Sequence, residues 1–338
     1  MAFFKKLLSN IFNQRNNKIN SIELLPEDPN VIIDATFNIG DYLAISPIIE
    51  AIKLQWEKPS ILVLCTAKNV DVVKFDPRVD YLLLPDKSQW YKYPSILKKY
   101  ITSRVHVDLF VEPAAPDLPH RAIIGFVLKP DLTIGIDYDN FPCMQPPLQK
   151  IDRANISQPK LYANMMLGYG FRETAGDFKV FEDQGNNLKI EKELQFRNVS
   201  NFVVFNPFAS TANRSLSIEK SKSILRMLAQ EGFNSLFLLP SYIHNKEEWN
   251  DELASVCDVF IVNSIHDSIC LIKNSLGVVS VDTALVHIAS VYDVPTIGLY
   301  RDKVINCKNW HPQSSKSHVG LISGPVNEII NTEIFIKN

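Results

Sequence analysis

The chain has 338 residues, of which 46% are hydrophobic and 21% are charged, and its formal net charge is −2. This composition is that of a folded globular protein and excludes a collagen-like or largely disordered chain, while the length favours two domains. The near-neutral charge disfavours general binding to nucleic acid. The cysteines show no Cys-x-x-Cys spacing, so we expect a reducing compartment and no structural metal site: Cys65, Cys143, Cys257, Cys270 and Cys307.

Residues 1–18 place apolar side chains at helical spacing opposite lysine and arginine, which predicts a basic amphipathic helix. Such a helix could lie on the anionic inner face of a membrane, or it could pack on the protein's own surface or on a partner. No run reaches the roughly 18 apolar residues of a transmembrane helix, and no secretory signal is present. We therefore expect a cytoplasmic protein, with peripheral attachment to the inner membrane left open.

After the N-terminal segment and linker, residues 1–30, short apolar runs that favour strands alternate with helical or turn-rich sequence. This alternation is typical of a parallel sheet with crossover helices, so residues 31–175 are predicted to form a first α/β domain. Its expected strands cover 31–35, 61–65, 81–84 and 107–111.

Polar sequence over 176–201 predicts an interdomain linker, and a second α/β domain is expected over 202–325. Its predicted strands cover 202–205, 235–239, 259–262, 277–281 and 296–300, and its predicted helices cover 218–231, 247–257, 267–274 and 284–292. Residues 326–338 are expected to form a helix or a tail that packs back on a domain.

Ligands of open α/β sheets bind outside the carboxyl ends of the strands, so polar strand-to-helix loops are the candidate sites. The first such loop is Asn38-Ile39-Gly40-Asp41, in which Gly40 permits a tight turn. Asp41 is either a cap of the following helix or a general base that takes a proton from an acceptor hydroxyl.

Two further loops belong to the second domain. Residues 206–214 offer hydroxyls, backbone N–H groups and the guanidinium of Arg214, which suit a diphosphate, although a solvated surface loop is the alternative. In residues 280–287, Asp282 and Thr283 begin a helix and His287 lies one turn further on. Separately, these residues could be a cap and a core histidine.

The same loops resemble segments of glycosyltransferase family 9, the ADP-heptose:lipopolysaccharide heptosyltransferases. SVDTALVHIASVYDVPTIGLY at 280–300 carries the longest likeness, and NIGDYLAISPIIEAIK at 38–53 and NPFASTANRSLSIEK at 206–220 agree with it in order and spacing. The sequence departs from the family pattern at Phe208 and Ala284, where glycine is usual, and at Leu216, where tryptophan is common.

The resemblance implies a GT-B fold, in which two Rossmann-like domains face each other across a cleft, and inversion that requires neither a metal nor another cofactor. It implies that Asp41 is the catalytic base. The residues expected to bind the donor are Ser210, Thr211, Arg214, Ser241, Asp282, Thr283, Ala284 and His287. The candidates for acceptor binding are Asn38, Gly40, His120 and Arg121.

The resulting hypothesis is an inverting glycosyltransferase that moves a sugar, with heptose the first choice, from a donor such as ADP-heptose. Its acceptor would be a glycolipid or polysaccharide of the bacterial surface, such as lipopolysaccharide or lipooligosaccharide core or capsule. The alternatives are another GT-B enzyme, such as a sugar-nucleotide epimerase, and a non-catalytic nucleotide-sugar-binding protein of a glycan assembly complex. A nucleic-acid partner is not expected. An NAD-dependent oxidoreductase is disfavoured because no strand is followed by Gly-x-Gly-x-x-Gly.

Overall fold

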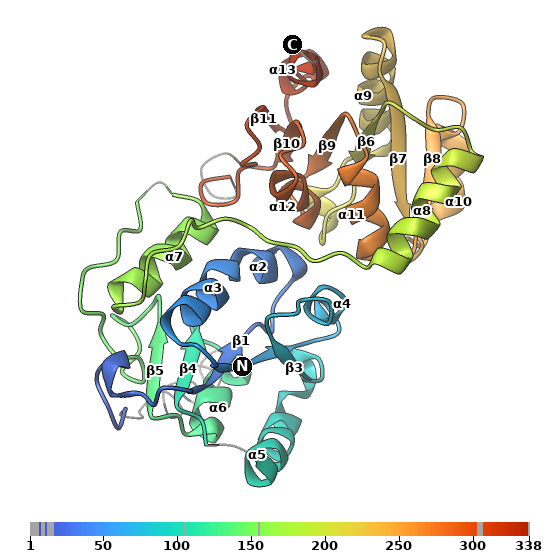
Figure 1. The fold of residues 1–338 in the computed structure, drawn as a ribbon. Helices are drawn as coiled ribbons and strands as arrows, with labels where there is room; N and C mark the ends of the chain where they lie inside the picture. Colours follow the sequence, from blue (N-terminus) through green and yellow to red (C-terminus); the bar gives the residue numbers. More distant parts are fainter. Residues whose placement is uncertain are drawn as a thin grey trace. The chain divides into compact units, whose positions relative to one another are not determined.

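The computed structural model of the chain describes residues 7, 11, 17–104, 106–154, 156–302 and 307–336. It forms two compact units, Met1–Asp177 and Phe178–Asn338, each with a parallel sheet flanked by helices (Figure 1). The helix predicted for residues 1–18 lies almost wholly outside the described residues. No helix in the described part of the chain is long and apolar enough to cross a membrane.

The first unit has a five-stranded sheet in the order β3-β2-β1-β4-β5. Its strands are β1 (Asn30–Asp34), β2 (Ser60–Cys65), β3 (Asp80–Leu83), β4 (Leu109–Glu112) and β5 (Leu132–Gly135). Its α-helices are α2 (Ile39–Ala44), α3 (Ser46–Gln55), α4 (Val70–Val73), α5 (Tyr93–Arg104), α6 (Pro119–Leu128) and α7 (Gln158–Gly168), and short 3-10 helices cover Ile22–Leu24 and Lys87–Lys92.

Helices α5 and α6 pack together over one face of this sheet (Figure 1). Side chains alternate between the two faces of a strand. Ile32 of β1 and Phe110 of β4 belong to one apolar cluster with Leu97 of α5 and Ile124 of α6. The residues two positions further along each strand therefore point toward the same helices.

The second unit has a six-stranded parallel sheet in the order β11-β10-β9-β6-β7-β8. Its strands are β6 (Phe202–Asn206), β7 (Asn234–Pro240), β8 (Asp258–Val262), β9 (Gly277–Val281), β10 (Thr296–Tyr300) and β11 (Ser317–Leu321). Its α-helices are α8 (Gln184–Phe196), α9 (Ile218–Gln230), α10 (Lys246–Leu253), α11 (Ile265–Lys273), α12 (Ala284–Val291) and α13 (Val326–Ile329), and 3-10 helices cover Ala212–Arg214 and Thr332–Phe335.

The polar segment 176–201, for which a linker is predicted, contains the 13-residue helix α8. This helix packs against α11, and Glu182 just before it pairs with Lys273 at 2.9 Å and accepts a hydrogen bond from Tyr292 at 2.7 Å. Helix packing and two polar contacts thus fix a stretch whose composition suggests a solvated connection. The 3-10 helix Thr332–Phe335 lies against the sheet, where the Phe335 ring covers the space that a Cβ at Gly277 would need.

Candidate functional site

In both sheets the strand order reverses beside the first strand of the unit. The chain proceeds outward from β1 to β2 and β3, then returns to the other side of β1 with β4; in the second unit β6 and β9 have the same relation. Such a reversal opens a crevice at the carboxyl ends of the two strands, which is the usual ligand site of a doubly wound sheet.

Asp41 lies in the first turn of α2, directly after β1. Its carboxylate accepts a hydrogen bond from the Asn38 backbone N–H at 3.1 Å, and the two residues form a capping box. Asp41 is only half-buried by side-chain exposure, yet removal from water raises the pKa of its carboxyl, against the opposing effect of the Asn38 hydrogen bonds and the Arg121 charge. The Asp41 side chain therefore caps α2 and is also a carboxyl group with a raised pKa.

Arg121 stands in the first turn of α6, in the same region as Asp41. Its guanidinium lies over the Phe37 ring, 5.8 Å from the centroid, and donates a hydrogen bond to the Ala115 carbonyl at 3.3 Å. Its Nε is buried without a partner, and among the described residues it forms no ion pair with a carboxylate. The neighbouring His120 is buried, and this burial lowers the pKa of its imidazole. Of the two, Arg121 is the one that can offer a positive charge.

In the second unit, the Asn206 side chain joins the two predicted donor loops. Its amide donates hydrogen bonds to Ser280 Oγ at 3.0 Å and Thr283 Oγ1 at 3.4 Å, and to the Phe208 carbonyl at 3.2 Å. Asn206 was not among the predicted site residues, although the motif contains it. Loops that are more than 60 residues apart in sequence are thereby held together at one edge of the sheet.

Arg214 and Asp282 meet across these loops. One guanidinium nitrogen of Arg214 donates to the Asp282 carboxylate at 2.8 Å and to its backbone carbonyl at 2.7 Å. Arg214 Nε is buried and has no partner among the described residues. Thr283 is the N-cap of α12 and Ala284 its first residue, so the backbone N–H groups of a helix N-terminus lie beside this ion pair.

The predicted hydroxyl donors are placed at the same edge of the sheet. Ser210 and Thr211 are exposed in the loop after β6, and the Thr211 hydroxyl donates to Asn213 at 2.8 Å. Ser241 is exposed just past β7, the neighbour of β6. The structure therefore groups Ser210 and Thr211 with Arg214, and places Ser241 one strand away.

His287 is buried between two aromatic rings that the sequence motifs do not include. It stacks on Phe178 with centroids 4.5 Å apart and lies 5.3 Å from the ring of Trp310. Burial, with a smaller effect of His311, lowers the pKa of His287 to about 3, so the imidazole is neutral at physiological pH. Phe178 comes from a polar stretch and Trp310 from a loop, and neither carries a sequence signal for this contact.

Two of the departures from the family pattern are core substitutions. The Phe208 ring packs against Trp249 and Phe237, with ring centroids 4.8 Å and 5.8 Å apart, respectively. Leu216 is buried in the same apolar cluster. Neither side chain is exposed in the donor loops. Ala284 is half-buried at the start of α12, so its methyl group is the one of the three changes that lies at the candidate site.

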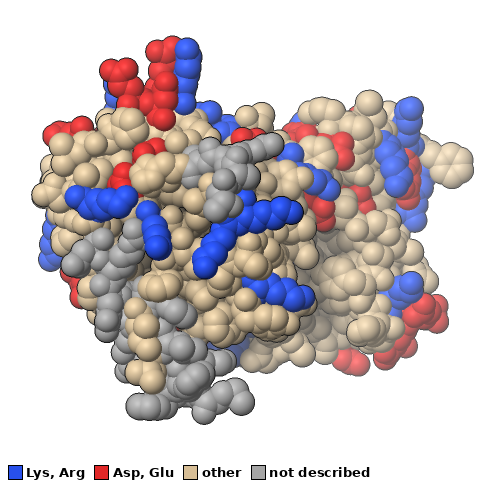
Figure 2. Space-filling model, turned by 90° about the horizontal axis from the view of Figure 1, so that it is seen from below, with Lys and Arg blue, Asp and Glu red and all other residues tan. Residues whose placement is uncertain are grey.

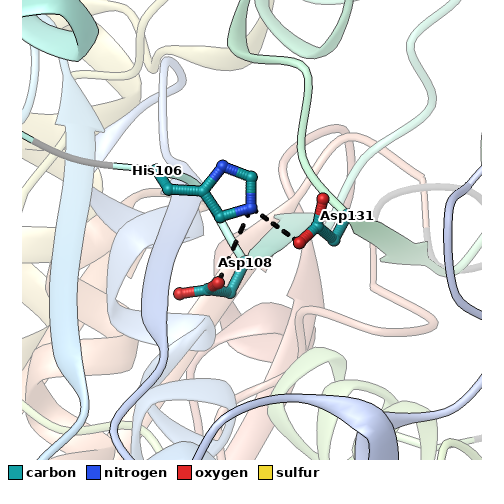
Figure 3. Close-up of side chains that lie close together, drawn as sticks. All are labelled: His106, Asp108 and Asp131. Atoms are coloured by element: carbon teal, nitrogen blue, oxygen red, sulfur yellow. Dashed lines mark hydrogen bonds and ion pairs between the residues drawn. The ribbon is translucent and has the colours of Figure 1, made fainter.

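One group among the described residues has the spacing of metal ligands, but it lies at the amino ends of β4 and β5, away from the crevice. Figure 3 shows His106 with Asp108 and Asp131. His106 Nε2 is 2.6 Å from Asp131, Lys18 also pairs with Asp131, and Asp108 accepts a hydrogen bond from the Asn30 backbone N–H at 2.7 Å. The polar atoms have protein partners, so the group acts as an anchor for the segments around residues 18 and 30.

The buried His287 makes a prediction about stability. Because folding lowers its pKa from 6.5 to about 3, the unfolded chain binds the proton first as the pH falls from 6.5 toward 3. The free energy of unfolding should therefore fall over this range, by up to about 1.4 kcal/mol per pH unit. His287→Phe keeps a ring between Phe178 and Trp310 but cannot be protonated, so urea unfolding at several pH values should show a smaller decrease. Equal pH dependence in both proteins would contradict this assignment.

Solved structures with the same fold include several bacterial sugar transferases. The chain is similar to the glycosyl transferase family 9 protein from Veillonella parvula (TM-score 0.72, 13% identity, 89% of each chain covered). It is also similar to E. coli ADP-heptose LPS heptosyltransferase II (TM-score 0.65, 13% identity, 86% of this chain and 92% of that one) and to E. coli heptosyltransferase WaaC with ADP (TM-score 0.62, 17% identity, 89% and 92%). These likenesses identify the fold as GT-B, built from two Rossmann-like domains.

No curated protein matches the sequence significantly. The family model for glycosyltransferase family 9 (heptosyltransferase) matches residues 114–323, which is more than half of the chain and includes both donor loops. The chain therefore belongs to glycosyltransferase family 9.

Proposed function

We propose that this protein is an inverting, metal-independent glycosyltransferase that moves a sugar, with heptose the first candidate, from a nucleoside-diphosphate donor such as ADP-heptose. The acceptor is a bacterial surface glycan, such as lipopolysaccharide or lipooligosaccharide core or capsule. Family membership supports the glycosyl transfer. The observation that carries the mechanism is Asp41, a fixed carboxylate with a raised pKa in the first turn of α2, the helix that follows β1.

Asp41 is the general base in this proposal. A base works best when its pKa approaches the pH of the reaction, and desolvation moves the Asp41 carboxyl in that direction. It takes the proton of the acceptor hydroxyl while the oxygen attacks the anomeric carbon on the face opposite the diphosphate. The transition state has oxocarbenium character, as in glycoside hydrolysis. Asn38 and Gly40 flank Asp41, and Arg121 binds an anionic group of the acceptor.

The donor diphosphate is assigned to the crevice between β6 and β9. Arg214, the N–H groups at the start of α12, and the hydroxyls of Ser210 and Thr211 supply hydrogen bonds and positive charge for the leaving diphosphate. The Asp282 carboxylate occupies one nitrogen of Arg214 and holds the guanidinium in place, and the unpartnered Nε offers another donor.

The base assignment is tested with Asp41→Asn, which keeps an oxygen for the Asn38 N–H but cannot take a proton. Transfer from ADP-heptose to truncated lipooligosaccharide acceptors should fall about 10²- to 10⁴-fold, with little change in ADP binding. The matched control is Asp267→Asn, because Asp267 holds the same capping-box position at the start of α11. This control should retain transfer at temperatures where it is folded. Wild-type transfer should also decrease as the pH falls through the raised pKa of Asp41.

The same assay separates the two alternatives. An epimerase would convert a nucleotide sugar without any acceptor, whereas a non-catalytic protein would bind the nucleotide sugar and yield no product. Full activity in the Asp41→Asn variant would contradict the proposed base.

The donor assignment predicts that Arg214→Ala weakens ADP binding by about 10- to 100-fold, because hydrogen bonds to charged groups contribute about 1.5–3 kcal/mol each. Isothermal titration calorimetry measures the change directly. Arg226→Ala on α9 is the control, since Arg226 is exposed and lies outside the donor loops, and it should bind ADP like the wild type. Unchanged affinity in Arg214→Ala would place the diphosphate elsewhere.

We also propose that the first unit binds the surface of an anionic membrane, where a lipid-linked acceptor would be found. The segment from Lys87 to Arg104, which contains α5, has five basic residues and no acidic residue. Figure 2 views the molecule from the side on which α5 lies in Figure 1, and Lys and Arg side chains gather near the middle of this face. Each lysine or arginine near an anionic surface contributes about 1 kcal/mol.

Reversing two of these charges tests the surface. The variant Lys98→Glu/Lys99→Glu should sediment less with vesicles that contain phosphatidylglycerol, while neither protein should bind vesicles of phosphatidylcholine alone. Lys189→Glu/Lys192→Glu on α8 makes the same change in net charge at exposed positions of the second unit and should bind like the wild type. Equal loss in both double variants would indicate a general charge effect and would contradict a binding face on α5.

A further inference from the structure

Two fully buried carboxyl groups lie at the strand reversal of the first sheet, and the proposed mechanism does not use them. Asp34 is the last residue of β1 and is 0% exposed, and Glu112 is the last residue of β4 and is 1% exposed. The strand register pairs Ile33 with Val111, so the next residue of each strand brings the two acids side by side. Both point to the face covered by α5 and α6, because they lie two residues after Ile32 and Phe110.

Each carboxyl has one satisfied oxygen and one that lacks a donor. Asp34 Oδ1 accepts from the Thr36 N–H at 2.9 Å, and Glu112 Oε1 accepts from the Ala114 N–H at 3.3 Å. Asp34 Oδ2 and Glu112 Oε2 are buried, and the described residues provide no donor to either. Ionised carboxylates only accept hydrogen bonds, so these two oxygens can bond to each other only if one of them carries a proton. Two ionised carboxylates in contact would instead repel each other.

The surroundings favour a single proton on the pair. Burial, followed by the neighbouring Asp34, raises the pKa of Glu112 well above its usual value. Within the described part of the chain, the other titratable groups that face the pair are His120 and Arg121 of α6, Cys143 after β5, Tyr93 of α5 and Tyr162 of α7. Burial keeps His120 neutral by lowering its pKa, and it raises the pKa values of the Cys143 thiol and the two tyrosines, which also stay neutral. Arg121 is left as the cation beside the pair.

We propose that Asp34 and Glu112 share one proton at neutral pH and thereby keep Arg121 free to bind an anionic group, a carboxylate or a phosphate, of the acceptor. A fully ionised Glu112 in this buried position would need a counter-ion, and Arg121 is the cation that could supply it. With the proton shared, Arg121 has no carboxylate partner among the described residues and stays over Phe37, next to the loop of Asp41. Glu112 and Asp34 are positioning residues, and their role at the acceptor rests on the proposed function.

The shared proton is tested first without any substrate. Glu112→Gln replaces the protonated carboxyl by an amide that can donate to Asp34 Oδ2. The wild type should show an infrared band of a protonated carboxyl group at neutral pH that Glu112→Gln lacks, and the exposed control Glu57→Gln should retain it. If Glu112→Gln does not fold, Asp34→Asn serves instead, since its amide donates to Glu112 and also removes the need for the proton.

The same proton determines how stability depends on pH. A carboxyl whose pKa is raised by folding stabilises the folded state fully below its unfolded pKa, near 4.5, and loses this contribution as the pH rises through the folded pKa. The unfolding equilibrium constant of the wild type should thus increase by up to about tenfold per pH unit over this range relative to Glu112→Gln. Identical pH profiles together with no carboxyl band would overturn the proton-sharing pair, even if transfer activity is intact.

The link to Arg121 is tested with acetate and inorganic phosphate as probes of anion binding. The probes are added to protein whose proposed donor site is already filled with ADP. Thermal stabilisation by one of the two anions should then disappear in Arg121→Gln. In the wild type it should weaken at alkaline pH, and in Glu112→Gln it should persist at alkaline pH. Acetate alone would indicate a carboxylate on the acceptor, and phosphate alone a phosphate. Stabilisation that does not depend on Arg121 would overturn the anion site. If the wild type and all variants lack transfer activity, but the wild type shows the carboxyl band and Glu112→Gln does not, the result would count against the proposed function and not against the proton-sharing pair.

Discussion

A parallel sheet that is covered by helices on both faces has few places for water or polar side chains except the ends of its strands. The reversal of strand order concentrates them further, because the loops after β1 and β4, and those after β6 and β9, leave in opposite directions and open a crevice. The residues that the proposed mechanism uses follow one of these four strands or begin the helix after it: Asp41, Arg121, Ser210, Thr211, Arg214 and Thr283. Topology alone therefore points to these two strand ends, one in each unit, as the expected ligand sites.

Helix capping and the proposed catalysis use the same groups at these strand ends. Asp41 satisfies the Asn38 N–H as a capping-box residue, and Thr283 caps α12 while accepting a hydrogen bond from Asn206. A capping side chain loses little conformational entropy when it meets a substrate, because folding has already fixed it. The first turn of a helix also presents N–H groups that stabilise negative charge. Residues that look structural by position are thus suited to bind or activate ligands.

Sequence periodicity predicted most of the second unit, since runs such as Gly277–Val281 and Thr296–Tyr300 are apolar, short and bounded by polar loops. It did not predict the helix in 184–196, because this helix owes its position to contacts of Glu182 with Lys273 and Tyr292, distant in sequence. For the same reason Phe178 and Trp310 had no signal as neighbours of His287. Which residues begin a loop can be predicted from sequence, but which distant side chains meet there cannot.

The arginines of the two candidate sites, one in each unit, are held in opposite ways, and the difference follows from the acids beside them. In the second unit, Asp282 is partly exposed and binds Arg214 directly, which fixes the position of the guanidinium. The proposed diphosphate has several oxygens with which to compete against this one carboxylate. In the first unit, Glu112 is fully buried, and an ion pair there would bear the desolvation cost of both charges. The proposed proton shared with Asp34 removes that need. In this proposal, burial of the neighbouring acid decides whether an arginine is held by an ion pair before its ligand binds or is left without a carboxylate partner.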